Sequence, residues 1–285
     1  MGNEYLREAE YVLCGCARCN LIFQRDIPNT ALMEKIYAPG IDPQAAFAQQ
    51  RSKAGVGHFS RHAQEVMQII GYFGRQPAAL RFLDFGMGWG EWVLMAKAFG
   101  CDGCGAELSG ERIRYAASNG IKAISWKEIP QLEVDFINTE QVFEHLPNPL
   151  ETLQHLKKGL RPGGLLKISV PTANDMKRRL GLMDWHAPRE SRNSLNPVAP
   201  LEHINCFNRS SLLKMAEEAG MEEVFIPVRV QYRHLTNWQG AKQIAKNILL
   251  PLYRNVLKKQ NYVFLKNAAA SSSQASQPAL LSAWV

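Results

Sequence analysis

The residues best placed to do chemistry form a glycine-rich loop between a predicted strand and a predicted helix. The loop reads Asp84-Phe85-Gly86-Met87-Gly88-Trp89-Gly90. Its glycines permit a tight turn and let a ligand approach the backbone closely, and the helix that follows begins with N–H groups that no helical carbonyl accepts. A carboxylate, Glu107, ends the next predicted strand, where it can accept both hydroxyls of a ribose. The sequence therefore predicts a nucleoside-containing ligand at this loop.

The spacing of the glycines separates two kinds of ligand. A dinucleotide loop needs G-x-G-x-x-G, whereas the third glycine here comes one residue early, as G-x-G-x-G, and Asp84 precedes the first glycine. This loop has no pyrophosphate to hold, and a carboxylate beside it suits a cationic ligand. The pattern favours S-adenosylmethionine, an adenosyl sulfonium, over NAD. The alternative is a glycine turn without a ligand, and the flanking strand–helix pattern makes that the weaker interpretation.

The elements that must position this loop alternate between strand and helix. Apolar runs predict strands at 81–85, 105–108, 121–125, 134–139, 165–170, 224–230 and 261–266. Helical spacing and caps predict helices at 60–75, 91–99, 110–118, 149–160, 208–219 and 238–259, the last interrupted at Pro251. A Pro-Gly-Gly turn at 161–164 separates one helix from the next strand. The alternation predicts an α/β fold with a Rossmann-like, doubly wound, mostly parallel sheet of seven strands.

Several of these motifs together resemble a known family, the class I S-adenosylmethionine-dependent methyltransferases of the type 11, 12 and 23 groups. The matching segments are 83–90, 105–109, 134–146, 160–164 and 201–207. The resemblance implies a methyltransferase whose cofactor-binding residues are Asp84, Gly86, Gly88, Gly90, Glu107, Leu108, Trp126, Thr139 and Gln141. In such proteins an acidic residue often follows the third strand, where this chain has Ser125 and Trp126. Stacking of Trp126 on the adenine is one interpretation, and a half-buried surface tryptophan is the other.

The amino-terminal cysteines resemble half of the zinc ribbon that precedes the domain in some relatives. Residues 11–23 match the second half of that ribbon, with Cys16 and Cys19 as its pair, and the first pair is missing. Structural zinc takes four ligands, whereas Cys14, Cys16 and Cys19 supply at most three at awkwardly close spacing. We therefore expect a degenerate ribbon and no zinc.

The candidate catalytic residues are two histidines and a glutamate. Glu202 could orient His203 as a base, and His145 follows the fourth predicted strand, on the side that faces the transferred methyl group. Some sugar methyltransferases with the same zinc-ribbon preface use a Glu–His pair at a similar place. This resemblance implies a small-molecule acceptor, a saccharide or sugar nucleotide of cell-surface biosynthesis. The alternatives are a helix-capping role for His145 and a structural role for His203.

Residues 172–207 break the strand–helix rhythm and are expected to form a lid over the acceptor. The lid carries the arginines Arg178, Arg179, Arg189 and Arg192, which could clamp an anionic acceptor or form a solvated basic loop. The basic helix at 238–259 could contact a membrane surface, which would favour a lipid or quinone acceptor, or simply pack on the sheet. A further alternative is a protein that binds S-adenosylmethionine without catalysing methyl transfer.

The composition excludes several other classes. The net charge of the 285 residues is +7, but the basic residues are not gathered in one run and no aromatic–basic stripe is present. We therefore expect no nucleic-acid partner. No apolar run approaches about 18 residues, so no transmembrane segment is expected. The amino terminus has no apolar signal region, which makes the cytoplasm the expected compartment.

The chain is expected to divide into four parts. These are a degenerate zinc-ribbon-like segment at 1–30, a helical lead-in at 31–78, a methyltransferase domain at 79–267 with the acceptor lid at 172–207, and a disordered tail at 268–285.

Overall fold

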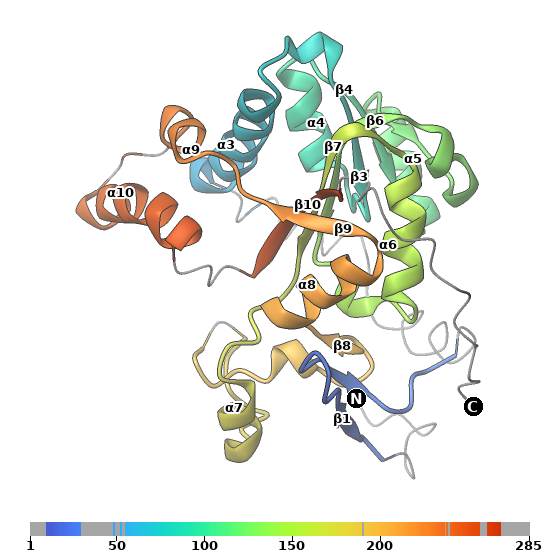
Figure 1. The fold of residues 1–285 in the computed structure, drawn as a ribbon, viewed down its shortest axis with the longest axis vertical. Helices are drawn as coiled ribbons and strands as arrows, with labels where there is room; N and C mark the ends of the chain where they lie inside the picture. The colour runs from blue at the N-terminus through green and yellow to red at the C-terminus, as the bar shows by residue number, and fades with distance from the viewer. Residues whose placement is uncertain are drawn as a thin grey trace.

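A seven-stranded sheet forms the centre of the computed structural model, which describes residues 10–29, 48, 52, 55–189, 191–236, 238, 240–256 and 261–268. The strand order is β5-β4-β3-β6-β7-β10-β9 (Figure 1). The parallel strands are β3 (Arg81–Phe85), β4 (Asp102–Ala106), β5 (Lys122–Ala123), β6 (Val134–Glu140) and β7 (Leu160–Ser169). β10 (Tyr262–Asn267) runs antiparallel to its neighbours β7 and β9 (Met221–Val224). The predicted α/β fold with a Rossmann-like, mostly parallel sheet is confirmed.

Helices cover both faces of this sheet. They are α3 (Val56–Phe73), α4 (Glu91–Ala98), α5 (Gly110–Ser118), α6 (Pro149–Lys158), α8 (Arg209–Glu218) and α9 (Val228–Arg233). A further helix, α10 (Ala241–Val256), packs against α9. In β3, Phe82 packs with Trp92 of α4 on one face, and Leu83 packs with Leu156 of α6 on the other. Because successive strand residues face opposite sides, an apolar strand of this kind needs a helix layer on each. No helix among the described residues is long and apolar enough to cross a membrane.

The structure corrects one predicted strand. Residues 224–230 are predicted as a strand, but β9 ends at Val224 and α9 begins at Val228. Pro227 has no N–H to donate to a ladder and stands at the first position outside α9. Val230 then packs from a helix into the cluster that contains Val66 of α3. Tertiary packing therefore overrides the strand propensity of the valines in this segment.

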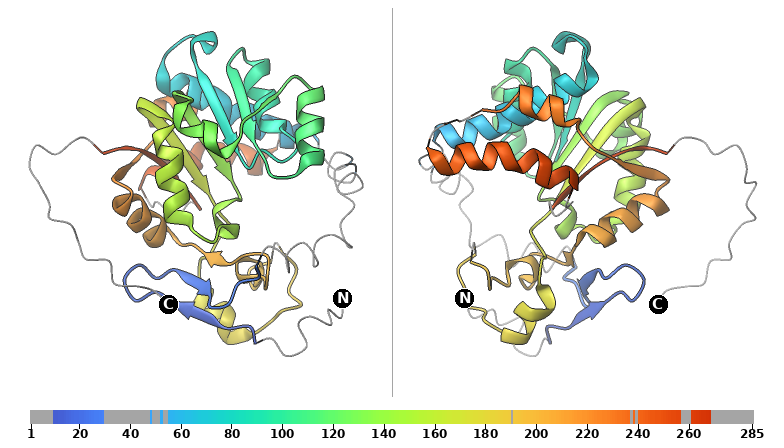
Figure 2. Two further views of the ribbon diagram at one scale, coloured as in Figure 1. Left: turned by 90° about the vertical axis from the view of Figure 1, so that its right-hand side faces the viewer. Right: turned by 60° about the vertical axis from the view of Figure 1, so that its left-hand side comes forward.

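A second, smaller sheet joins the amino terminus to the predicted lid. It consists of β1 (Leu13–Gly15), β2 (Ile22–Gln24) and β8 (Asn205–Cys206), all antiparallel. Leu13 and Ile22 pack on a buried cluster with Met176 of α7 (Met176–Leu182) and with Cys206. Figures 1 and 2 place this hairpin and α7 together, beyond the carboxyl ends of the parallel strands. The amino-terminal hairpin and the lid thus share one core.

The predicted division of the chain remains a proposal. Residues 1–9, most of 30–54 and the tail from 269 onward lie outside the described residues. The described part of the predicted lid contains α7 and a short helical turn, η5 (Asn196–Val198).

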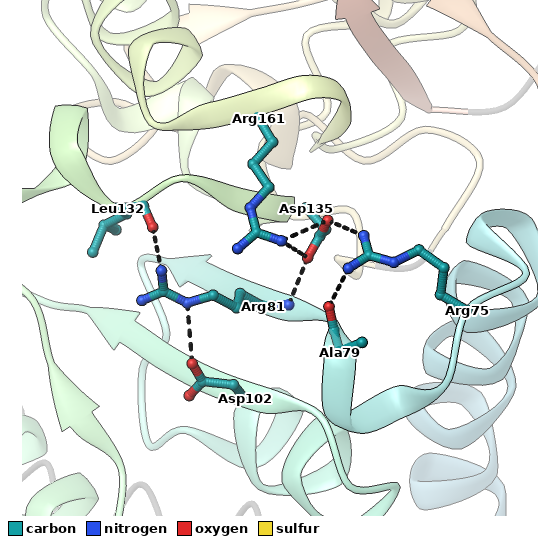
Figure 3. Close-up of polar contacts among 7 residues, drawn as sticks. All are labelled: Arg75, Ala79, Arg81, Asp102, Leu132, Asp135 and Arg161. Carbon is teal, nitrogen blue, oxygen red and sulfur yellow. Dashed lines mark hydrogen bonds and ion pairs between the residues drawn. The ribbon is translucent and has the colours of Figure 1, made fainter.

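One buried carboxylate ties together the amino ends of the central strands (Figure 3). Asp135 of β6 accepts hydrogen bonds from Arg75 Nη1 at 2.7 Å, from Arg161 Nη1 at 3.3 and 3.4 Å, and from the Arg81 backbone N–H at 2.8 Å. Arg161 reaches it because residues 161–164, predicted as a turn, form an irregularity inside β7, where the register steps from Leu160 opposite Val134 to Leu165 opposite Phe136. Asp135 therefore joins β3, β6, β7 and the end of α3.

We expect Asp135→Ala to lower the free energy of unfolding by about 1–3 kcal/mol, because it removes the shared acceptor of Arg75, Arg161 and the Arg81 backbone N–H. Asp102→Ala is the matched control, since the Asp102 side chain is 62% exposed and pairs with the half-exposed Arg81. It should cost less than about 1 kcal/mol. Urea denaturation measures both variants, and equal losses would contradict this account of Asp135.

Candidate functional site

The glycine loop between β3 and α4 is shaped by three left-handed glycines. Gly86, Gly88 and Gly90 have φ angles of 77°, 54° and 80°. The Gly86 and Met87 N–H groups donate to the Ala106 carbonyl at 2.9 and 3.0 Å, which holds the loop against β4. A side chain at Gly86 would meet Val142 within 2.5 Å, whereas one at Gly88 would meet nothing within 4 Å. The backbone at Gly88 is therefore open to a ligand on the side where a side chain would stand.

Glu107 lies directly beside this loop. Its Oε2 accepts from the Gly88 N–H at 3.0 Å, and its Oε1 accepts from the N–H groups of Leu108 and Ser109 at 2.9 and 3.0 Å. Each carboxylate oxygen has two lone pairs, so Oε2 keeps one that no backbone donor uses. These hydrogen bonds hold the Glu107 carboxylate next to the open face of Gly88, where it could accept hydrogen bonds from ribose hydroxyls. Loop and carboxylate together fit a nucleoside cofactor.

Asp84 lies at the end of β3 in a buried polar environment. Its Oδ1 accepts from Asn138 Nδ2 at 2.8 Å. Burial raises the pKa of Asp84 to about 7, although the Asn138 hydrogen bond and the charge of Lys167 oppose that rise. A carboxyl group with this pKa can change its charge near neutral pH when a cation binds beside it.

Lys167 is a buried cation that the sequence analysis did not select. Its Nζ donates to Glu65 Oε1 and to Glu140 Oε2, both at 2.7 Å. Burial alone would lower the pKa of Lys167, but the two carboxylates raise it above its usual value. The signal was available in the sequence, because a lysine interrupts the apolar run of a predicted core strand.

A polar cavity opens beside Lys167, at the carboxyl ends of β6 and β7. Its volume is about 310 Å³, and α3, β7, β9 and β10 contribute to its walls. The lining includes Arg61, Glu65, Glu140, Lys167, Ser169 and Asn261. The lining contains both donors and acceptors, together with aromatic side chains such as Phe225 and Phe264, and therefore suits a ligand with hydroxyl or amide groups.

The remaining predicted cofactor-binding residues differ in exposure and in their contacts. The Leu108 side chain is fully exposed beside Glu107. Trp126 is 46% exposed and stacks on His155, with ring centroids 3.8 Å apart. The Thr139 hydroxyl is buried and donates to the Lys167 carbonyl at 2.8 Å, so it faces β7 rather than the loop. Gln141 is exposed and takes a left-handed φ of 55° where β6 ends.

The structure brings His145 and His203 together but orients them differently from the prediction. Their rings lie 4.9 Å apart, and burial lowers the pKa of His203. His203 Nδ1 donates to the Asn196 carbonyl at 2.5 Å, while the Glu202 carboxylate lies 3.5 Å from Arg189. Glu202 acts on His145 through its backbone, because His145 Nδ1 donates to the Glu202 carbonyl at 2.6 Å.

Glu144, next to His145, is a site residue that the sequence analysis missed. Its side chain is 1% exposed, and burial raises its pKa to about 8. Its Oε1 lies 3.9 Å from His145 Nε2. Of the lid arginines, Arg178 and Arg179 bond to Asn193 and to the Ser194 carbonyl, so they brace the lid internally.

Comparison with known proteins agrees with this fold. The type 23 family model, described as a methyltransferase domain, matches residues 55–224. The chain is 34% identical to trans-aconitate 2-methyltransferase of Rhizobium rhizogenes over 77 residues. These residues make up 27% of this chain and 30% of that relative. The match therefore spans less than a third of the relative's length.

A solved methyltransferase shares the fold. The plantazolicin methyltransferase BpumL, in complex with a pentazolic desmethylPZN analog and SAH, has a TM-score of 0.52 at 14% identity, covering 84% of this chain and 95% of that chain. A SAM-dependent methyltransferase from Archaeoglobus fulgidus has a TM-score of 0.41 at 15% identity, covering 84% of this chain and 99% of that chain. Since the family model spans more than half of the sequence, the chain belongs to the methyltransferase-domain family.

Proposed function

We propose that this enzyme methylates a hydroxyl-rich small molecule, a saccharide or sugar nucleotide, bound in the cavity beside Lys167. The observation that carries the proposal is the position of that cavity. It opens at the carboxyl ends of β6 and β7, and the glycine loop lies at the same edge of the sheet, after β3. In a doubly wound sheet, ligands bind at this edge.

The loop and its neighbours are proposed to hold the cofactor, which supplies a methyl group on a cationic sulfur. In this proposal Gly86, Gly88 and Gly90 wrap the methionine part, Glu107 accepts the ribose hydroxyls, and Asp84 provides negative charge. Leu108 and Trp126 are exposed apolar side chains that an adenine would cover. Thr139 and Gln141 are proposed to contact the cofactor through their backbone atoms. The Thr139 hydroxyl is already hydrogen-bonded to the Lys167 carbonyl of β7.

The polarity of the cavity supports a saccharide over the other acceptors. Carboxylates such as Glu65 and Glu140 accept hydrogen bonds from hydroxyls, while Arg61 and Asn261 can donate them. A lipid or quinone acceptor would need a mainly apolar lining. An anionic acceptor is the second candidate, because Arg61 lines the cavity and a matching relative is named for trans-aconitate. The carboxylates in the lining disfavour it.

His145 and His203 are proposed to serve the acceptor side of the reaction. Because each donates its Nδ1 proton to a backbone carbonyl, each keeps an Nε2 lone pair that can take a proton or bind a cation. Glu202 is proposed to position His145 through its carbonyl. The enzyme's main contribution remains the alignment of donor and acceptor for an in-line displacement.

Gly88→Ala tests the cofactor loop. A left-handed alanine costs about 1–2 kcal/mol in the backbone, and a ligand approaching at Gly88 would also meet the new methyl group. Gly120→Ala is the matched control, with a φ of 72° and likewise nothing within 4 Å of the added carbon. In calorimetric titration, we expect Gly88→Ala to bind S-adenosylmethionine at least tenfold more weakly than the wild type. Gly120→Ala should bind it with the affinity of the wild type. Equal affinities for the two variants would refute the proposed loop.

The charge of Asp84 predicts a pH dependence of cofactor binding. Burial raises the Asp84 pKa to about 7, so the carboxyl group is neutral below that pH and negative above it. Affinity for the sulfonium should therefore increase from about pH 6 to about pH 8, and less so for S-adenosylhomocysteine, which lacks the positive sulfur. In Asp84→Asn, the affinities for S-adenosylmethionine and S-adenosylhomocysteine should no longer differ in their pH dependence. If the ratio of the wild-type affinities for S-adenosylmethionine and S-adenosylhomocysteine does not change with pH, this role for Asp84 is excluded.

An acceptor panel tests the substrate class. We expect methyl transfer to sugar nucleotides, and we expect Arg61→Gln to raise the acceptor KM several-fold while S-adenosylmethionine affinity stays unchanged. The control is Arg229→Gln, because Arg229 is exposed and does not line the cavity. Turnover confined to quinones or lipids would overturn the saccharide assignment, and turnover confined to carboxylic acids would favour the second candidate.

A further inference from the structure

Three potential metal ligands converge outside the cavity and the glycine loop. Ligand atoms of Glu144, His145 and His203 all lie within 4.8 Å of one another. Glu144 and His145 belong to the short turn η4 (Phe143–His145), and His203 comes from the lid, just before β8. Asn205 Nδ2 donates to the Leu146 carbonyl at 2.7 Å and so fixes the two segments to each other.

The histidines are oriented as metal ligands are. A backbone carbonyl can only accept a hydrogen bond, so the Nδ1 atoms that contact Glu202 and Asn196 must carry the protons. Each Nε2 then has a lone pair when the ring is neutral. Metal-binding histidines typically donate their other ring N–H to a carbonyl or carboxylate in this way.

Glu144 supplies the observation that points to a cation. Its side chain is 1% exposed, and within the described residues neither of its carboxylate oxygens has a hydrogen-bond partner. Oε1 faces His145 Nε2 at 3.9 Å, which is too long for a hydrogen bond, and in the neutral ring that nitrogen has no proton to give. A buried carboxyl oxygen thus faces the lone pair of a half-exposed imidazole, an arrangement that costs free energy unless a proton or a metal cation lies between them.

We propose that Glu144, His145 and His203 bind a divalent transition-metal ion of the Zn²⁺ type. Two imidazole nitrogens and one carboxylate are a known ligand set for zinc with an open fourth position. Tetrahedral ligands at zinc distances are about 3.4 Å apart, so side-chain rotations that shorten the separations of up to 4.8 Å by up to about 1.4 Å would complete the site. Because the His145 side chain is 41% exposed, the ion can enter from solvent.

The site also has a place in the reaction, and this step rests on the proposed function. Val142, the residue before η4, contacts the loop at Gly86, so the ion would lie on the side of the glycine loop that borders the lid. The open coordination position could then hold an oxygen of the acceptor. The two histidines would act as ligands, and neither would serve as a free base.

A second group of possible ligands is a weaker candidate. His58, His62 and Glu91 also lie within reach of one ion, but all three are partly exposed. His58 Nε2 and Glu91 Oε2 are already hydrogen-bonded at 2.9 Å. Among the described residues Glu91 has no unsatisfied buried oxygen of the kind found at Glu144, so this group serves as the internal comparison.

Titration of the metal-stripped full-length protein with Co²⁺ and then Zn²⁺ tests the site. We expect one ion per chain, a Co²⁺ absorption spectrum typical of nitrogen and oxygen ligands, and at least tenfold weaker binding in Glu144→Gln and His145→Asn. His145 is exposed, so its variant should fold even where His203→Asn does not. His62→Asn and Cys16→Ser are the controls and should bind like the wild type.

The outcomes separate the metal site from the proposed function. No binding of either ion, undiminished binding in both ligand variants, or loss in a control variant would overturn the metal site. S-adenosylmethionine titration of the same variants is the parallel measurement, and the cofactor should bind to all of them with unchanged affinity. If the wild type does not bind S-adenosylmethionine, the proposed role of the glycine loop is refuted, whereas the result of the metal titration is unaffected.

Discussion

A buried ammonium group organises the carboxyl edge of the sheet. Lys167 has lost almost all contact with water, and such a charge is tolerated only when its counter-charges are held in good geometry. Glu65 must therefore come from α3 and Glu140 from the end of β6, and the Ser169 hydroxyl donates to Glu140 from β7. This requirement fixes α3 over the strand ends, and the wall of the polar cavity follows from it.

The parts of the site that depend on local sequence were predictable. The glycine loop, Glu107 and the strands around them are short-range patterns, and the helix at 110–118 was predicted to the residue. Groups that meet only through tertiary structure were not predictable. Glu65 and Lys167 are 102 positions apart, and nothing near either residue identifies the other. The partner of His203 was assigned by adjacency to Glu202, whereas the chain turn at η5 presents the Asn196 carbonyl instead.

The amino-terminal hairpin supports the acceptor side of the site from a distance. The buried Gln24 side chain donates to the carbonyls of Ala199 and His203, at 3.2 and 3.1 Å. The Tyr11 hydroxyl donates to the Val198 carbonyl. The segment that resembles half a zinc ribbon therefore holds the backbone at the end of η5 and after it, up to His203 itself.

The place of β10 in the sheet constrains how the domain can be assembled. β10 is the last of the seven strands in the chain, yet it stands between β7 and β9 and pairs with both. During synthesis β7 must keep an open edge until β10 emerges about 90 residues later, a wait of roughly 5–20 s at typical translation rates. An unpaired edge can template association with other chains. For this protein, the interval before β10 arrives is the period when chaperone protection matters most.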